Sequence, residues 1–502
     1  MNINPLTCLD YPDPDVIRVD DTYYMISTTM HFMPGGEILR SYDLVNWEHA
    51  AFIYDRLDGT PAQSLENGTN IYGKGMWAAC IRYHKGIFYV AFVCNDTHKT
   101  YLYTSEKIEG PWKKSNIDGF FHDCSILFDD DDRVYIVYGN REIHLTELNS
   151  ELTGPKEGGI DRIIVKDSDK TSLGYEGSHF YKINGKYYIF LIHSLEDRWF
   201  RAEACFMADR IDGEFNGGDI FVNDMNYCNM GVAQGGIVDT PDGKWYGVFF
   251  QDRGAVGRIP VLVPMEWKDD YPKMCDNLEE IINPKTDSLR PGHVYSPLCG
   301  SDSFDSCDGP SFGLKSFWQF NHEPELSLTK LDCKSGNNGI WSVTTDRIVN
   351  DVTCAKNTIT QRLPFPGVHV EVTLDATNIN DGDYAGLVVI QGAYGFIGIT
   401  KEDGQYYMVM KERVRAEGMT SRYSEPEEIR VAIESPIQIL FFDADFLDMK
   451  DEVTFNIGPS HKMYFELDHF TGNRAGLCMY STKEFGGTAK FSNFVLTRTR
   501  IV

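Results

Sequence analysis

A short strand–turn–strand unit recurs five times in the first half of this chain. Each unit has a glycine- or acid-rich turn followed by an aromatic pair or near-pair, ending at Tyr24, Tyr89, Tyr135, Tyr188 and Tyr246. Successive anchors are 65, 46, 53 and 58 residues apart. Repeats of this length with several short strands each are typical of β-propellers, in which one repeat forms one blade. We therefore predict a five-bladed β-propeller.

One position of the repeat carries side chains suited to chemistry. It lies 11 or 12 residues before the aromatic anchor and is filled, in chain order, by Asp13, Trp77, Asp123, Glu176 and Gln234. Because the innermost strands of a propeller surround its axis, residues at one register form a ring at one mouth. Clustered buried acids cost free energy unless they are paired or put to use. The ring therefore predicts an active site with carboxylates on three blades.

The second half of the chain lacks this repeat. Residues 268–303 are rich in Pro, Gly, Asp and Lys, which indicates a linker that we expect to pack along the surface. Long alternating segments follow it, at 369–374, 385–390, 394–399, 406–410 and 491–496. Such strands, with few helical stretches, indicate an antiparallel β-sandwich. We predict an all-β protein with a propeller catalytic domain over 1–295 and a β-sandwich accessory domain over 300–502.

Composition narrows the partners and the cellular location. A net charge of −27 disfavours nucleic acid and anionic membrane surfaces. No run of 18 apolar residues exists that would span a bilayer, and residues 1–5 do not resemble the start of a secretory signal. The twelve cysteines are scattered without paired spacing, so we expect them to be unpaired thiols in a reducing cytoplasm. The oligomeric state has no signal in the sequence.

The three carboxylates fit the requirements of glycoside hydrolysis. That reaction needs one protonated acid for the leaving oxygen and one carboxylate that acts as base or nucleophile. A third acid can tune the others, because a nearby negative charge raises a carboxyl pKa and keeps the group protonated near neutral pH. Acids on separate blades can lie across a sugar from one another.

The ordered motifs resemble glycoside hydrolase family 43, which comprises β-xylosidases, α-L-arabinofuranosidases and arabinanases. The resemblance rests on Tyr11-Pro12-Asp13-Pro14-Asp15, His122-Asp123-Cys124-Ser125, Tyr175-Glu176-Gly177-Ser178-His179 and the stretch 251–260. In the second half, 318–322 and 357–362 resemble the concanavalin-like β-sandwich of the xylosidase branch. The resemblance implies an inverting mechanism. Asp13 would be the general base, Glu176 the general acid and Asp123 the pKa modulator.

Other assignments implied by the resemblance concern binding. Trp77 would form a sugar-stacking wall, and Arg258 would hold a sugar hydroxyl or the modulating acid. Gln234 takes the place of the fifth blade, while His31 and Phe32 lie on a loop that we expect to rim the pocket. No cofactor is required. A structural Ca²⁺ ion is possible but has no signal in the sequence, and Ala233 replaces a histidine found in many relatives, which puts an axial metal ion in doubt.

These observations together predict the function. We expect an exo-acting inverting glycosidase that removes terminal β-D-xylose or α-L-arabinofuranose, or both, from xylo- or arabinoxylo-oligosaccharides during hemicellulose degradation. The two sugars present similar hydroxyl geometry, so dual activity is compatible with one pocket. An endo-arabinanase, which needs an open groove, and a non-catalytic sugar-binding propeller remain as alternatives.

Overall fold

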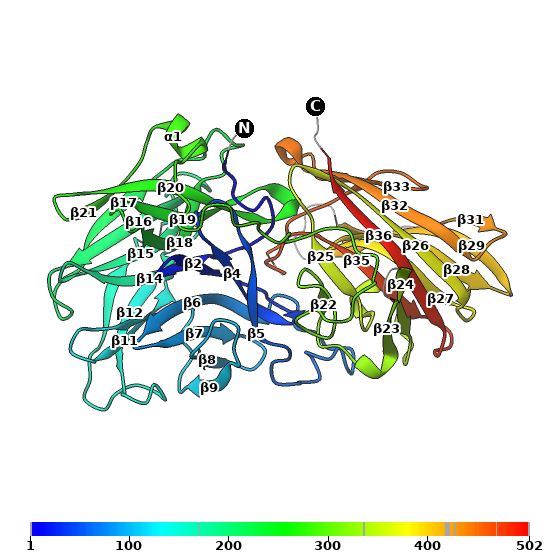
Figure 1. The fold of residues 1–502 in the computed structure, drawn as a ribbon, viewed down its shortest axis with the longest axis horizontal. Coiled ribbons are helices and arrows are strands. Elements are labelled where there is room, and N and C mark those ends of the chain that lie inside the picture. Colours follow the sequence, from blue (N-terminus) through cyan, green and yellow to red (C-terminus); the bar gives the residue numbers. More distant parts are fainter. Residues whose placement is uncertain are drawn as a thin grey trace.

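A computed structural model describes residues 3–499 except 169, 335–336, 417–421, 426–427 and 468. Five four-stranded antiparallel sheets surround an axis, and two larger sheets follow in a second body (Figure 1). The predicted all-β class, a five-bladed propeller followed by a β-sandwich, is confirmed. Within the described residues no helix has the length and apolar character needed to cross a bilayer.

Each blade is a meander whose strands run in sequence order from the axis outward. Blade 1 comprises β1 (Asp15–Val19), β2 (Thr22–Ile26), β4 (Gly35–Ser41) and β5 (Glu48–Tyr54). Blade 2 comprises β6 (Met76–His84), β7 (Ile87–Cys94), β8 (Lys99–Ser105) and β9 (Lys113–Ile117). Blade 3 comprises β10 (Ser125–Phe128), β11 (Val134–Asn140), β12 (Glu142–Leu148) and β13 (Asp161–Lys166). Blade 4 comprises β14 (Glu176–Ile183), β15 (Lys186–Ser194), β16 (Arg201–Ala208) and β17 (Asn216–Phe221). Blade 5 comprises β18 (Val232–Asp239), β19 (Trp245–Asp252), β20 (Arg258–Lys268) and β21 (Tyr271–Met274).

The hydrophobic cores of the propeller lie between neighbouring blades. Ile38 and Ile53 of blade 1, for example, join Val90 and Phe92 of blade 2 in one buried cluster. Further clusters join blades 2 and 3, 3 and 4, and 4 and 5. Another joins blade 5 to blade 1 and closes the ring. No blade can bury its own faces alone, so the blades seal one another and the inner strands are held in register around the axis.

The second body is a sandwich of a nine-stranded and a seven-stranded sheet. The nine-stranded sheet contains β3 (Phe32–Met33), β22 (Gln319–Asn321), β25 (Ile359–Arg362), β35 (Arg474–Ser481), β27 (Asp383–Ile390), β28 (Tyr394–Glu402), β29 (Gln405–Arg415), β30 (Tyr423–Ser424) and β31 (Ile429–Ile433). The seven-stranded sheet contains β23 (Thr329–Lys334), β24 (Asn337–Thr344), β36 (Thr488–Arg498), β26 (Gly367–Asn378), β32 (Ile437–Asp445), β33 (Glu452–Phe455) and β34 (His461–Lys462). Short helical turns are η1 (Gly254–Val256), α1 (Leu278–Ile282), η2 (Leu326–Leu328), η3 (Val352–Cys354) and η4 (Leu447–Met449).

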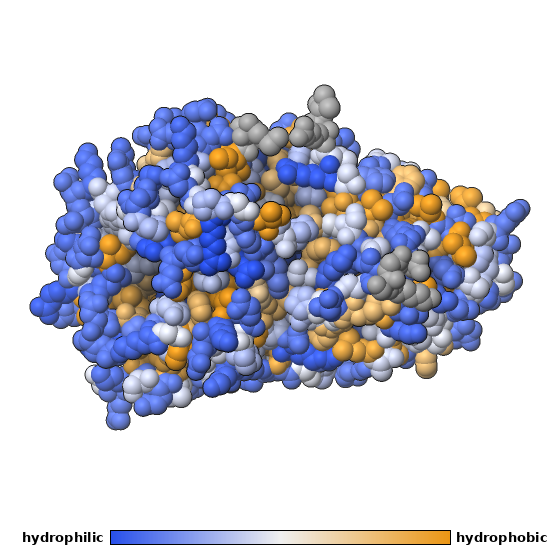
Figure 2. All heavy atoms as spheres, viewed as in Figure 1, coloured by the Kyte–Doolittle hydropathy of each residue, from blue (hydrophilic) through white to orange (hydrophobic). Residues whose placement is uncertain are grey.

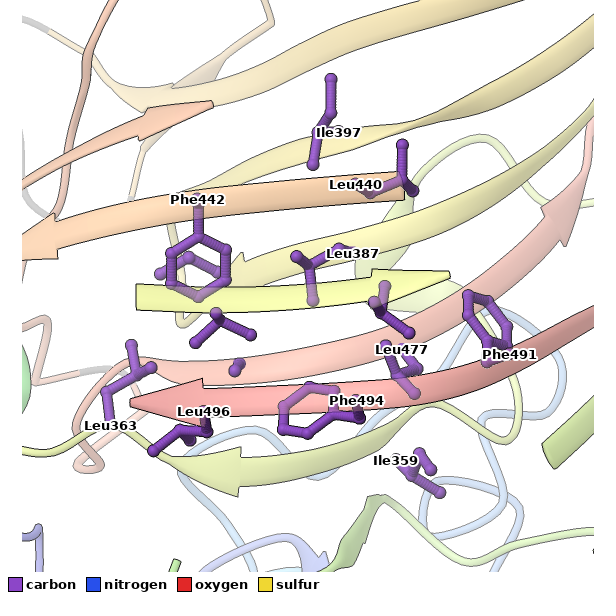
Figure 3. Close-up of a cluster of buried hydrophobic side chains, with 14 of the residues drawn as sticks. Ile359, Leu363, Leu387, Ile397, Leu440, Phe442, Leu477, Phe491, Phe494 and Leu496 are labelled. Atoms are coloured by element: carbon purple, nitrogen blue, oxygen red, sulfur yellow. The ribbon is translucent and has the colours of Figure 1, made fainter. Parts of the chain in front are cut away.

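The core of the sandwich fills the space between these two sheets. Figure 3 shows Leu387 and Leu477 of one sheet packed towards Phe442 and Phe491 of the other. All four side chains are fully buried. Apolar residues alternate along β26 and, less regularly, along β36, as the sequence pattern predicted, because successive side chains of a strand point to opposite faces. The alternation expected over 385–390 is wrong, because β27 is buried on both of its faces there.

A strand of the propeller region crosses into the sandwich. β3 lies between β2 and β4 in sequence, yet it pairs with β22, with Phe32 opposite Asn321 and Met33 opposite Phe320. The two bodies therefore share a sheet as well as a side-chain interface. This pairing could not be predicted from the sequence, because a strand of two residues has no detectable period.

The linker was predicted to pack along the surface, and in the structure it contacts blade 1, although blade 5 extends into it as far as Met274. Arg290 forms an ion pair with Asp21, with Nε to Oδ2 at 2.7 Å. Tyr295 accepts a hydrogen bond through its hydroxyl from the backbone N–H of Tyr42. The connection is therefore a fixed part of the molecule.

One expectation about cysteines is wrong. Cys307 and Cys333 form a disulfide, with their Cα atoms 5.9 Å apart, which links the segment before β22 to β23. The ten other cysteines are free, and half of them are buried as small apolar side chains. The two cysteines are 26 residues apart and belong to no local motif, so their pairing could not be predicted from the sequence.

The surface agrees with the acidic composition. Hydrophilic side chains cover much of the face shown in Figure 2, and apolar residues show between them. Scattered apolar surface of this kind is ordinary for a globular protein.

Candidate active site

The five residues predicted to share a register lie at or just before the starts of the inner strands, at one mouth of the propeller. Asp13, Asp123 and Gln234 adopt left-handed backbone conformations, with φ of 53°, 48° and 56°. In blade 4 the left-handed residue is Gly177, directly after Glu176, with φ of 64°. Left-handed residues and β-bulges re-aim side chains and concentrate at functional sites. We call this end of the propeller the carboxylate mouth.

Asp13 is held by two hydrogen bonds. Its Oδ2 accepts from the Thr28 hydroxyl at 2.6 Å, and its Oδ1 lies 2.9 Å from Arg258 Nη1. All three side chains are buried. Of the two roles implied for Arg258, pairing with the modulating acid is therefore wrong, because its partner is Asp13 and not Asp123. The contact leaves the carboxylate fixed in orientation.

Asp123 and Glu176 flank His122. The Nε2 atom of His122 lies 3.7 Å from Asp123 Oδ2 and 3.8 Å from Glu176 Oε2. Asn140 donates a short hydrogen bond to Glu176 Oε2. Burial, reinforced by the charges of Glu176 and Asp13, raises the pKa of Asp123 to about 7, against the opposing effect of His122. Glu176 and Asp13 both act electrostatically on Asp123, so the three predicted carboxylates converge on one site.

His122 was not singled out by the sequence. Burial lowers its pKa, but the carboxylates of Asp123, Glu176 and Asp13 outweigh this effect and raise the pKa to about 9. The imidazole is therefore protonated at neutral pH. It provides a positive charge among three acids. The sequence signal that could have identified it is its position directly before Asp123.

An aromatic wall closes one side of the mouth. The Trp77 ring lies 5.5 Å from that of His122 and 4.9 Å from that of Phe470, between ring centroids. Phe470 belongs to the sandwich, so the second domain reaches the carboxylate mouth. The Trp77 indole N–H is occupied by the Gly73 carbonyl. The ring face of Trp77, rather than its N–H, is what this residue offers to a ligand.

Gln234 completes the ring on blade 5. Its backbone N–H donates to Glu203 Oε2 at 2.7 Å, and its side chain lies where a Cβ on Gly177 would collide, 2.6 Å from the amide carbon. Gly177 is therefore required beside Glu176 for Gln234 to pack there. Burial raises the pKa of Glu203 well above its usual range, against the opposing effect of the hydrogen bond from Gln234.

His31 and Phe32 lie in the contact between the domains. His31 is buried, with its Nε2 2.9 Å from Asn321 Oδ1 and its ring 4.6 Å from that of Tyr72. Phe32 lies under the Arg474 guanidinium, 3.4 Å from its ring centroid. Burial, reinforced by neighbouring histidines and Arg474, lowers the pKa of His31 well below its usual range. The structure thus places these two residues against the sandwich.

The residues at the axis do not fit a metal ion. Ala233 is buried and offers no donor atom. One layer further in, the Asp15 carboxylate is already paired with Arg82 at 2.6 Å and with His179 at 3.0 Å.

Among the described residues, one group of three potential donors converges, namely His122, Asp123 and Glu176, with atoms within 4.8 Å of one another. Metal binding requires a deprotonated imidazole. Since the pKa of His122 is raised to about 9, the imidazole is protonated at neutral pH, and the three residues are poorly suited to bind a metal ion.

Asp10 connects the site to the sandwich. Its Oδ1 accepts from the backbone N–H of Arg258 at 2.7 Å, and its Oδ2 accepts from that of Gly472 at 2.8 Å. Added Cβ atoms at Gly257 or Gly472 would collide with neighbouring atoms, so the segments meet at backbone distance. One carboxylate therefore fixes both the strand that carries Arg258 and the segment that follows Phe470.

Replacement of Asp10 by alanine is expected to lower the free energy of unfolding by about 2–5 kcal/mol, because two buried N–H groups lose their acceptor. Chemical denaturation measures the effect. Asp10→Asn, which keeps one acceptor oxygen, should lose less. A loss within ~0.5 kcal/mol for the alanine variant, the range of neutral surface changes, would contradict the proposed link.

The fold and the site together define a glycoside hydrolase. A propeller mouth that gathers several carboxylates beside an aromatic wall supplies the acid, the base and the surface that cleavage of a glycosidic bond requires.

Comparison with known proteins agrees with this class. Residues 3–272 match the model of glycosyl hydrolases family 43, and residues 302–497 match the β-xylosidase C-terminal concanavalin A-like domain. The chain belongs to glycosyl hydrolases family 43. Glycosidases of this family require no cofactor.

Several relatives show how far the similarity extends. A β-xylosidase of Formosa agariphila is 25% identical over 97% of this chain and 88% of its own length. A non-reducing end α-L-arabinofuranosidase of Bacteroides ovatus is 26% identical over 66% of this chain and 64% of its own. A structure of a bifunctional GH43-CE protein of Bacteroides eggerthii is 37% identical, with a TM-score of 0.86 over 99% of this chain. This chain spans 64% of the length of that protein.

Proposed function

We propose that this enzyme is an exo-acting inverting glycosidase that releases terminal β-D-xylose, α-L-arabinofuranose or both from short hemicellulose oligosaccharides. The observation that carries the proposal is the convergence of Asp13, Asp123 and Glu176 at a mouth walled by Trp77 and Phe470. The named activities of the relatives, β-xylosidase and α-L-arabinofuranosidase, support the choice of sugars.

The proposed mechanism uses one water molecule. Asp13, oriented by Arg258 and Thr28, takes a proton from the water molecule while the oxygen of that water attacks the anomeric carbon. Glu176 donates its proton to the glycosidic oxygen as the bond to the leaving sugar breaks. Asp123 and His122 lie beside Glu176 and set its electrostatic surroundings.

The second domain favours a pocket over a groove. Phe470 of the sandwich closes one side of the carboxylate mouth, and an endo-acting arabinanase needs an open passage for the chain on both sides. A non-catalytic sugar-binding propeller would not require a base, an acid and a charged imidazole within one site.

Kinetics on 4-nitrophenyl β-D-xyloside and 4-nitrophenyl α-L-arabinofuranoside, with and without chelator, test the proposal. Product analysis on linear arabinan and on xylo-oligosaccharides separates the alternatives. Single sugars as the first products support exo action, medium-length products from arabinan indicate endo action, and binding without any new sugar indicates a binding protein.

The location of the enzyme remains a prediction. We expect a cytoplasmic enzyme acting on imported oligosaccharides, but the Cys307–Cys333 disulfide weighs against the argument from cysteines, since disulfides persist mainly in oxidising compartments. Fractionation of the native organism, with thiol labelling of the purified protein, tests this point.

Replacement of His122 by glutamine is expected to shift the alkaline limb of the kcat/KM profile upward by about one pH unit. The imidazolium stabilises the ionised form of Asp123, so its removal raises the pKa of Asp123 further, and that carboxyl retains its proton to higher pH. His84→Gln, at the opposite end of an inner strand, is the control. A limb that stays in place or moves to lower pH would refute this account.

A further inference from the structure

We infer that Trp199 forms a binding platform for the sugar on the leaving-group side of the scissile bond, an inference that rests on the proposed function. The residue lies on the loop between β15 and β16, which belong to the same blade as Glu176. The structure thereby assigns a second sugar-binding position, outside the pocket that holds the terminal sugar.

Strand register places this loop at the carboxylate mouth. Glu176 is opposite Ile192 on β15, and Ile192 is opposite Glu203 on β16. The hairpin continues past this level to its last pair, Ser194 and Arg201. Because neighbouring strands are antiparallel, the loop joining β15 to β16 lies at the end where β14 begins. Trp199 therefore lies beyond Glu176 in the direction of solvent.

The indole ring is both open and fixed in place. Of the eight tryptophans, all of them in the described part of the chain, Trp199 alone is exposed, at 46%. The Arg201 guanidinium lies 5.3 Å from the centroid of its ring. Arg201 is buried and donates from Nε to Asp252 Oδ2 at 2.8 Å. The ring is thus supported by an immobilised cation, and much of its surface is left to solvent.

The same support reaches the catalytic base. Asp252 Oδ1 lies 3.6 Å from Arg258 Nε, and Arg258 holds Asp13. Arg201 and Arg258 also lie over the Phe250 ring, at 5.3 and 4.7 Å. A binding surface positions its ligand well when its residues are held by neighbours of this kind. Arg201, which supports the Trp199 ring, is therefore part of the packed framework of the site, while the ring itself lies at its surface.

The chemistry of the reaction selects the ligand. The general acid must face the glycosidic oxygen that leaves, so the departing sugar lies on the Glu176 side of the site. A neutral sugar has an apolar C–H face that packs on an indole ring, and sites of this type combine aromatic surface with few polar contacts. Trp199 meets these conditions for the leaving portion of an oligosaccharide.

The test compares two substrates that share the terminal sugar. One is an oligosaccharide of four units, and the other is the glycosyl fluoride, whose leaving group has no ring to stack. Trp199→Ala is expected to lower kcat/KM on the oligosaccharide roughly tenfold, through KM, and to leave the fluoride unchanged. Trp199→Phe should recover most of the loss. Tyr83→Ala, an exposed aromatic at the opposite end of an inner strand, is the matched control.

Two results would overturn the inference. Equal losses on both substrates would assign Trp199 a structural role, and no loss on either would exclude the platform. Calorimetric binding of the oligosaccharide to the Glu176→Gln protein, with and without Trp199→Ala, gives an independent reading. If the wild-type enzyme releases no sugar, the proposed function fails, but the binding measurement still tests the platform. A roughly tenfold loss of affinity on Trp199→Ala would support the platform, and an unchanged affinity would reject it.

Discussion

Asp13→Asn is expected to lower kcat by roughly 10²–10⁴-fold on every substrate, whatever the leaving group. An amide cannot take the proton from the attacking water, and the step that it would assist is common to all substrates. The asparagine oxygen can still accept from Arg258, and its amide can still donate to Thr28, so the site keeps its shape. Steady-state kinetics on aryl glycosides and oligosaccharides measure the loss.

The control for this variant is Asp132→Asn, an exposed carboxylate in the turn of blade 3 that pairs with Lys85. It should retain wild-type activity. Thermal unfolding of both variants separates a chemical effect from loss of fold. If Asp13→Asn keeps more than half of the wild-type kcat with an unchanged midpoint, Asp13 is not the base.

Glu176→Gln is expected to have an effect that depends on the leaving group. On oligosaccharides, whose sugar alkoxide cannot leave without a proton, kcat should fall by roughly 10²–10⁴-fold. On a 2,4-dinitrophenyl glycoside, which leaves without protonation, the loss should be much smaller. Glutamine keeps an acceptor for Asn140, so the local hydrogen bond survives the change.

The prediction is tested by comparing the loss of kcat on oligosaccharides with the loss of kcat on the 2,4-dinitrophenyl glycoside. A plot of log kcat against leaving-group pKa should be steeper for the variant than for the wild type. Glu142→Gln, a partly exposed carboxylate on β12 that pairs with Lys166, serves as the control and should leave both rates unchanged. Equal losses for good and poor leaving groups would assign the acid to another residue.

The repeat made the propeller and its ring predictable from the sequence. Residues such as Asp13 and Asp123 lie at one register because blades are copies of one unit, and copies placed around an axis bring equal positions together. This geometry does not depend on loops. The inner strands β10 and β14 accordingly begin within two residues of Asp123 and Glu176.

Contacts between the two domains could not be predicted from the sequence. Phe470 reaches Trp77, and Asp10 bridges Arg258 and Gly472, across separations of hundreds of residues. Such contacts depend on how the sandwich is placed, and no local pattern encodes that placement. The expectation for His31 and Phe32 was drawn from their loop alone. The structure buries that loop against the sandwich, where the Arg474 guanidinium lies over the Phe32 ring.

The short strand β3 limits how this enzyme can be rebuilt. Phe32 and Met33 belong to a blade loop by sequence, yet they form the outermost member of a sheet whose other strands all come from the second half of the protein. A chimera that transplants the sandwich onto another propeller would leave that sheet with an unmatched edge. Such an edge invites association between copies. A graft that also carries residues 30–34 would keep the backbone hydrogen bonds between β3 and β22 at that edge.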